Sequence, residues 1–142
     1  MKYGKIIKIE EIYNDKMEGY KITTTKEEIN IGISNHQSCC ESYGSCAGFQ
    51  NDSGGYIITE DELNNFKMAE IKDVLVVDQL LDVFDGDTWK DEDLYASFVN
   101  IETDKGTLQF VVYNSHNGYY GHDIRIWIDS FDYYELLEKG SI

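Results

Sequence analysis

The sequence predicts an α+β fold, a single domain over residues 1–142 built mainly of antiparallel β-sheet with two or so short helices. Short runs of β-branched and aromatic residues recur along the chain, and Gly, Asn and Asp turn signals separate them. Two segments carry helix signals instead. A chain of 142 residues fits one domain and can bury a core without disulfides.

The first strands should form a hairpin. Residues 5–12 are a short run rich in β-branched residues. In residues 20–34, apolar and polar residues alternate on both sides of a charged break at 26–28. Alternation with period two is typical of a half-buried strand, so the break should be a turn. The later segment 48–55 has the Gly, Asn, Asp and Ser content of a loop.

The second half predicts further strands. Residues 71–84 are ambiguous, but their Val-Leu-Val-Val centre favours a strand. Three more β-rich segments follow at 95–103, 107–113 and 122–128. Asp104–Gly106 lies between the first two of these three and has a tight-turn sequence, so they should pair as a hairpin.

The two helices are predicted from local signals. Thr59 followed by Glu62 is a capping box, which predicts the start of a short helix. Residues 130–140 have a helix-like pattern of apolar and acidic residues, and Gly140 would end that helix.

The formal net charge of -15 argues against direct binding to duplex nucleic acid, because phosphates repel an acidic surface. The acid could serve solubility, or it could imitate a polyanion and dock on a basic host protein. The seven acids across residues 78–93 are the first place to look for such a face. The acidic segment 82–93 within this range lacks the residue order of a calcium loop. With no signal peptide and no long apolar run, a cytoplasmic protein without a membrane partner is expected, and a homo-oligomer is compatible with the sequence.

Residues 35–46 hold all three cysteines, and an odd count in the cytoplasm argues against a disulfide framework. A zinc site could draw on His36, Cys39 or Cys40, Cys46, and His116 or His122. The stretch has no Cys-x-x-Cys pair, so the spacing does not favour zinc. A cysteine nucleophile with a histidine and Glu41 has only the residue types in its favour. Small buried thiols are the simpler interpretation, and neither metal nor cofactor is expected.

Residues 114–124 are the second notable stretch. Asn117–Gly118 is a strong hairpin signal, and a plain hairpin loop is one interpretation. The stretch also gathers hydroxyls, imidazoles and tyrosine rings, and Arg125 follows on the same strand face as Asp123. Rings that stack on bases and an Arg that clamps phosphate would suit a nucleotide-like ligand.

Both stretches resemble a family of small uncharacterised domains found in phage and bacterial genomes. Gln37, Cys39, Cys40 and Glu41 match the family's first motif, and the Asn-Gly-Tyr-Tyr of 117–120 matches its second. The chain departs from the family at His116 and Gly121, where the family has serine. The resemblance extends over residues 5–128 and implies a phage or mobile-element setting, with one site built from the two stretches.

Taken together, these features predict a small phage-encoded binding protein that inhibits a host defence process by sequestering a nucleotide-like ligand. The ligand-binding residues would be Glu41, His116, Asn117, Tyr119, Tyr120 and Arg125. The alternative is an acidic, polyanion-mimicking inhibitor of a basic nucleic-acid-binding host protein. A hydrolase that uses His116 or His122 with Glu41 is the third interpretation. Because no catalytic constellation stands out, an enzyme is not favoured.

Overall fold

Strands make up the regular structure of the described residues. The computed structural model describes residues 3–37, 42–49, 64–82, 93–116, 121–130 and 132–142. Every pair of neighbouring strands is antiparallel. In chain order the strands are β1 (Ile6–Tyr13), β2 (Met17–Thr24), β3 (Glu27–Ser34), β4 (Ser42–Phe49), β5 (Ile71–Asp82), β6 (Asp93–Thr103), β7 (Gly106–His116), β8 (Asp123–Ser130) and β9 (Tyr134–Ser141).

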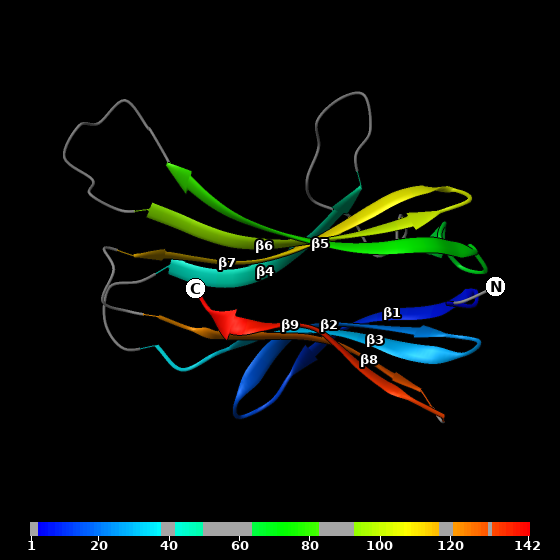
Figure 1. Cartoon of the computed structure of the whole chain (residues 1–142), viewed down its shortest axis with the longest axis horizontal. Helices are drawn as coiled ribbons and strands as arrows, with labels where there is room; N and C mark the ends of the chain where they lie inside the picture. The colour runs from blue at the N-terminus through cyan, green and yellow to red at the C-terminus, as the bar shows by residue number, and fades with distance from the viewer. Residues whose placement is uncertain (1–2, 38–41, 50–63, 83–92, 117–120, 131) are drawn as a thin grey trace.

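The strands form two sheets that lie one above the other as layers (Figure 1). One sheet has five strands in the order β1-β2-β3-β8-β9, and the other has four in the order β4-β7-β6-β5. The chain therefore crosses between the layers after β3 and again after β7. The first crossing runs through the cysteine stretch and the second through the 114–124 stretch, so the topology itself relates the two motifs.

The core lies between the two layers. Alternate residues of β3 point inward and face alternate residues of its neighbour β8, and all six are isoleucines: Ile29, Ile31, Ile33, Ile124, Ile126 and Ile128. Leu108, Phe110 and Val112 supply the opposite wall from β7. The Tyr20 and Phe110 rings meet across the gap, with their centroids 5.1 Å apart. This inward alternation confirms the hairpin predicted for residues 20–34.

The α+β prediction is wrong, because the described chain is a β-sandwich with no helix in its described residues. Residues 134–141, expected to be helical, are the edge strand β9, which pairs with β8. A register shift beside Trp127 makes Leu137 an extra residue, so Leu136 pairs with Trp127 while Leu137 packs against the core. Such a bulge breaks the period of two, and the adjacent leucines then imitate a helical pattern.

The other predicted helix was to begin at Thr59, which lies outside the described residues together with Glu62. The described chain resumes at Asn64, which has helical backbone; a turn over residues 65–68 follows, and β5 begins at Ile71. The strands predicted for 95–103, 107–113 and 122–128 are confirmed, and the strand predicted for 71–84 is confirmed up to Asp82, since residues 83 and 84 lie outside the described residues.

The turn predicted at Asp104–Gly106 is confirmed as well. Gly106 adopts a positive φ of 127° directly after the turn, a conformation that glycine reaches without strain.

No helix in the described ranges is both long and apolar enough to pass through a lipid bilayer.

Candidate functional site

The residues that follow the cysteine motif pair with those that begin the 114–124 stretch, in the four-stranded sheet. Ser42, which follows the cysteine motif, pairs with Ser115, and Tyr43 pairs with Asn114. These pairs belong to β4 and β7, which are far apart in the sequence. The ends of the two stretches are therefore held together by a β-ladder.

A stack of three rings reinforces this junction. The His122 ring is buried, and its centroid lies 4.1 Å from that of Tyr43 and 5.5 Å from that of His36. His122 Nδ1 lies 2.6 Å from the carbonyl oxygen of Ser34. Because a carbonyl only accepts, Nδ1 carries a proton and donates it to this bond. The Tyr43 hydroxyl donates to the Asn35 carbonyl at 2.6 Å, which fixes the outer ring of the stack.

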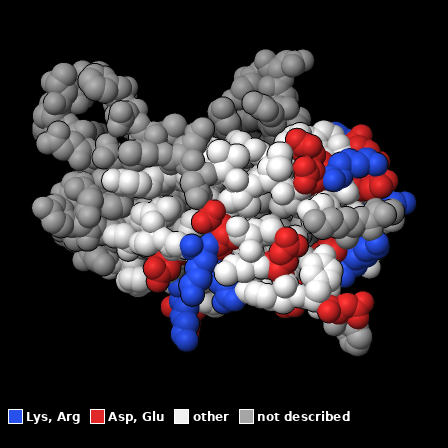
Figure 2. Space-filling view, viewed as in Figure 1, with Lys and Arg blue, Asp and Glu red and all other residues white. Residues whose placement is uncertain are grey.

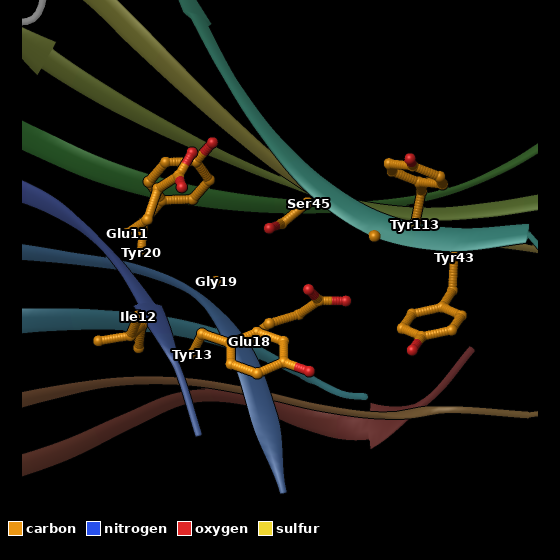
Figure 3. A pocket seen from close by; sticks show the side chains of 10 residues that line it. Glu11, Ile12, Tyr13, Glu18, Gly19, Tyr20, Tyr43, Ser45 and Tyr113 are labelled. Atoms are coloured by element: carbon orange, nitrogen blue, oxygen red, sulfur yellow. The ribbon is translucent and has the colours of Figure 1, made fainter. Parts of the chain in front are cut away.

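Tyr43 also lines a pocket at the open edge of the sandwich, where β1 and β2 of one sheet face β4 of the other (Figure 3). The pocket has a volume of about 230 Å³. Its lining combines carboxylates, tyrosines and backbone at two glycines: Glu11, Ile12, Tyr13, Glu18, Gly19, Tyr20, Tyr43, Gly44, Ser45 and Tyr113. The pocket and the ring stack are therefore contiguous through a single side chain.

Gly44 gives Tyr113 access to this pocket. Tyr113 pairs with Gly44 on the edge strand β4. A Cβ atom added to Gly44 would lie 2.9 Å from the Tyr113 hydroxyl oxygen and 3.2 Å from the ring carbon that carries it. Since glycine has no side chain, the Tyr113 ring can lie against the backbone of the edge strand, where it forms part of the pocket lining.

The hydroxyl and thiol groups around the pocket resist ionisation. Burial, and then the neighbouring Glu11 carboxylate, raise the pKa of Tyr20 to about 12, and the Tyr20 hydroxyl donates a hydrogen bond to Glu11. Burial also raises the pKa of Tyr113, and Cys46 and Glu18 raise it further. The Cys46 thiol nearby has a pKa that burial raises. These three groups are therefore neutral at pH 7.

The raised pKa of Tyr20 predicts a late step in an alkaline titration. The folded protein keeps the Tyr20 proton up to about pH 12, whereas the unfolded chain releases it near 10.0. The free energy of unfolding should therefore fall as the pH rises through this window, and Tyr20→Phe should reduce that fall. Tyrosinate absorbance at alkaline pH measures the step directly. A titration of Tyr20→Phe that retained the whole late step would contradict the assignment.

Most of the ligand-binding residues predicted from the sequence are not placed. Glu41, Asn117, Tyr119 and Tyr120 lie outside the described residues. His116 is the last residue of β7, where its backbone pairs with Asp93 and its side chain is not described.

Arg125 lies on the outer face of the five-stranded sheet. Its guanidinium lies over the Trp127 ring, 5.0 Å from the centroid, and over the Tyr134 ring at 5.6 Å. It also donates a hydrogen bond to the Tyr134 hydroxyl. Arg125 and Asp123 are both exposed while Ile124 between them is buried, which confirms their shared face. That face points away from the pocket, so the structure does not bring Arg125 to it.

The metal and acidic-surface hypotheses depend largely on residues that are not placed. Cys39 and Cys40 lie outside the described residues, as do Asp85 to Glu92 of the acidic segment. Within the described ranges, no three His, Cys, Asp or Glu side chains come together to hold a metal ion. On the face seen in Figure 2, acidic and basic side chains lie beside one another in several places.

Sequence reasoning did not single out the pocket residues, because they come from strands β1, β2, β4 and β7. One signal was present in β2. Its inward alternation through Ile22 and Tyr20 continues to Glu18, which places a carboxylate at a position that faces the other sheet. A charge at an inward strand position is unusual enough to indicate a site.

The fold and site thus define a two-sheet β-sandwich protein with an acidic, tyrosine-lined pocket at one open edge. The chain belongs to a family of domains of unknown function, DUF7448, whose model matches residues 1–126. This confirms the expectation of an uncharacterised domain family. Neither the curated proteins nor the solved structures contain a match to the chain.

Proposed function

We propose that this domain is a small, non-catalytic binding protein that captures a low-molecular-weight polar ligand in the pocket between β1–β2 and β4. The observation that carries the proposal is the pocket itself, where aromatic rings and a few converging polar groups line a concave site. The adjoining ring stack supports it, because His36, His122 and Tyr43 pack beside the pocket and hold its wall in place.

The setting is part of the same proposal. The resemblance to domains of phage and bacterial genomes supports a phage-encoded protein that acts in the host cytoplasm. There, withholding a ligand would inhibit a host defence process. The nucleotide-like ligand expected from the sequence would need Glu41 and residues 117–120, which lie outside the described residues. The proposal therefore names only a polar ligand, which the described lining of the pocket supports.

A catalytic role receives no support at His122. The ring is 1% exposed, and its Nδ1 proton is committed to the Ser34 carbonyl. A general acid or base must reach the proton that it transfers, directly or through one water molecule. This placement favours a structural role for His122 and a binding role for the pocket beside it.

Native mass spectrometry before and after denaturation tests the proposal. Tyr43→Ala should lose a bound ligand that the wild type retains, because it removes one wall of the pocket. Tyr134→Ala is the matched control, since Tyr134 is exposed on the outer face of the other sheet. Far-UV circular dichroism confirms that each variant folds. Equal ligand retention in Tyr43→Ala and the wild type would place the ligand elsewhere and reject the pocket.

The net charge of -15 favours a second candidate, an acidic surface that docks on a basic nucleic-acid-binding host protein. Binding through such a surface should weaken steeply between 50 mM and 500 mM salt, because exposed charges are screened. Pull-down of a basic host protein that is insensitive to salt would argue against this mechanism.

A further inference from the structure

We infer that the pocket takes an organic cation, an ammonium or guanidinium group on a short aliphatic chain, with the Glu18 carboxylate as its main anionic contact. This inference rests on the proposed function and names the chemical class of the ligand. It differs from the nucleotide-like ligand expected from the sequence, whose phosphate would carry the opposite charge.

The charge of the pocket is the first argument. Its lining contains the carboxylates of Glu11 and Glu18 and contains no Lys, Arg or His. Among the described residues, Lys8 forms an ion pair with Glu10, Lys21 with Glu28 and Lys72 with Glu70. Neither pocket carboxylate takes part in them. A cation that enters the pocket therefore meets two carboxylates that no described Lys or Arg neutralises, while an anion is repelled.

The walls of the pocket are the second argument. Four tyrosines line it: Tyr13, Tyr20, Tyr43 and Tyr113. The face of a tyrosine ring attracts ammonium and guanidinium groups. In Figure 3, the Glu18 side chain extends from β2 toward the space below Ser45, and the Tyr43 ring lies below β4, to the right of Glu18. A carboxylate beside aromatic rings is a suitable environment for an organic cation.

Hydrogen-bonding capacity points the same way. The Tyr20 hydroxyl already donates a hydrogen bond to Glu11, so it can only accept a hydrogen bond from a ligand. Glu18 accepts only, and Ser45 and Tyr113 can accept as well as donate. Ammonium has three N–H donors and guanidinium has five, with no acceptor to leave unsatisfied. The acceptor-rich lining therefore matches donor-only groups.

The volume limits the size of the ligand. A water molecule takes about 30 Å³ in the liquid, so the 230 Å³ pocket has room for roughly seven or eight. Pockets for drug-sized ligands are larger, at about 300–1,000 Å³. An alkylamine of about four carbons, or one arginine side chain, is of the right size.

Calorimetric titration with four probes tests the inference. Agmatine carries a guanidinium and an ammonium, 1,4-diaminobutane carries two ammonium groups, 1,4-butanediol is the neutral counterpart of the latter, and adenosine monophosphate is anionic. The two cations should bind, and the diol and the nucleotide should not. Glu18→Gln should weaken agmatine binding about tenfold or more, as expected for a lost charge-assisted contact.

Glu10→Gln is the matched control. Glu10 lies on β1 next to Glu11, but it pairs with Lys21 on the outer face of the sheet and forms an ion pair with Lys8. Its loss removes the same charge from the protein and none from the pocket, so agmatine affinity should change less than twofold. Equal weakening by Glu10→Gln and Glu18→Gln would mean that only net charge matters, and would overturn the inference.

The cation could come from a free amine or from the arginine side chain of a partner protein. The tripeptide Gly-Arg-Gly, amidated and acetylated, distinguishes the two sources by binding more tightly than agmatine if a side chain is the natural ligand. Whichever of the two binds more tightly, the result supports an organic cation as the ligand. If no cation binds at millimolar concentration, the inference fails. In that case a ligand that native mass spectrometry finds and Tyr43→Ala loses would still uphold the proposed function.

Discussion

Phe110→Ala is expected to lower the free energy of unfolding by about 3–5 kcal/mol. Phe110 lies on β7 in the four-stranded sheet, and its side chain is fully buried. Its ring meets Tyr20 of the other sheet, with a centroid distance of 5.1 Å and an interplanar angle of 55°. Truncation to Ala would remove a large apolar ring and leave a cavity between the layers, because strands fixed by their ladders cannot collapse into it.

Urea unfolding measures this loss, and Phe98→Ala is the matched control. Phe98 is on the neighbouring strand β6, where it pairs with Val111 on the outer face of the same sheet and is only half-buried. The same truncation there should cost about 1–2 kcal/mol, because the site remains open to water. A loss at Phe98 that equals the loss at Phe110 would mean that the gap between the sheets is not the main core.

Phe110 also shows how far sequence patterns reach. The β-rich segment 107–113 predicted the strand, and alternation within it selects Leu108, Phe110 and Val112 as one face. Nothing in that segment indicates which strand of the other sheet supplies the facing ring. Such contacts between layers depend on the whole topology. Local sequence patterns therefore could not predict the pocket either, because residues from four strands line it.

Two local patterns were misleading for opposite reasons. In β9 the bulge at Leu137 hid the strand period behind a helix-like leucine pair. In β4 the small residues Gly44, Ser45 and Gly48 gave no strand propensity, although the segment pairs with β7 along its whole length. Each of these segments is the edge strand of its sheet and forms its ladder with one neighbouring strand. In both, this pairing determines the strand structure, and local sequence propensity does not.

The motif stretches were only partly informative about the site. Their flanks do meet, through Ser42 and Ser115, as one shared site would require. Their described rings, however, pack against each other in the stack of His36, His122 and Tyr43. The two stretches reach the end of the sandwich where the pocket lies, but the carboxylates that give this pocket its charge come from β1 and β2.

Gly19→Ala is expected to destabilise the protein by about 3 kcal/mol or more. Gly19 lies in β2 with a φ of 155°, a conformation that residues with a side chain rarely adopt. A Cβ atom there would lie 1.9 Å from the carbonyl oxygen of Ile31 and 2.9 Å from its carbonyl carbon. Because Ile31 belongs to β3, which pairs with β2, its carbonyl cannot move aside without disturbing the ladder.

Gly32→Ala is the matched control, because Gly32 pairs directly with Gly19 across the two strands. A Cβ atom there would lie 2.1 Å from the Met17 sulfur, but the obstacle is a flexible, half-buried side chain that can adopt another rotamer. Its cost should stay within about 1 kcal/mol. Thermal and urea unfolding of both variants measure the difference, and equal losses would show that the clash at Gly19 is relieved by movement of the backbone.

The position of Gly19 links this prediction to the pocket. Gly19 lies between Glu18 and Tyr20, and all three line the pocket. The unusual φ at Gly19 therefore helps to set the directions in which its two neighbours project. At a temperature where Gly19→Ala remains folded, agmatine should bind it more weakly than it binds Gly32→Ala, because only the first substitution moves the carboxylate of Glu18. Equal affinities would show that Glu18 holds its position independently of Gly19.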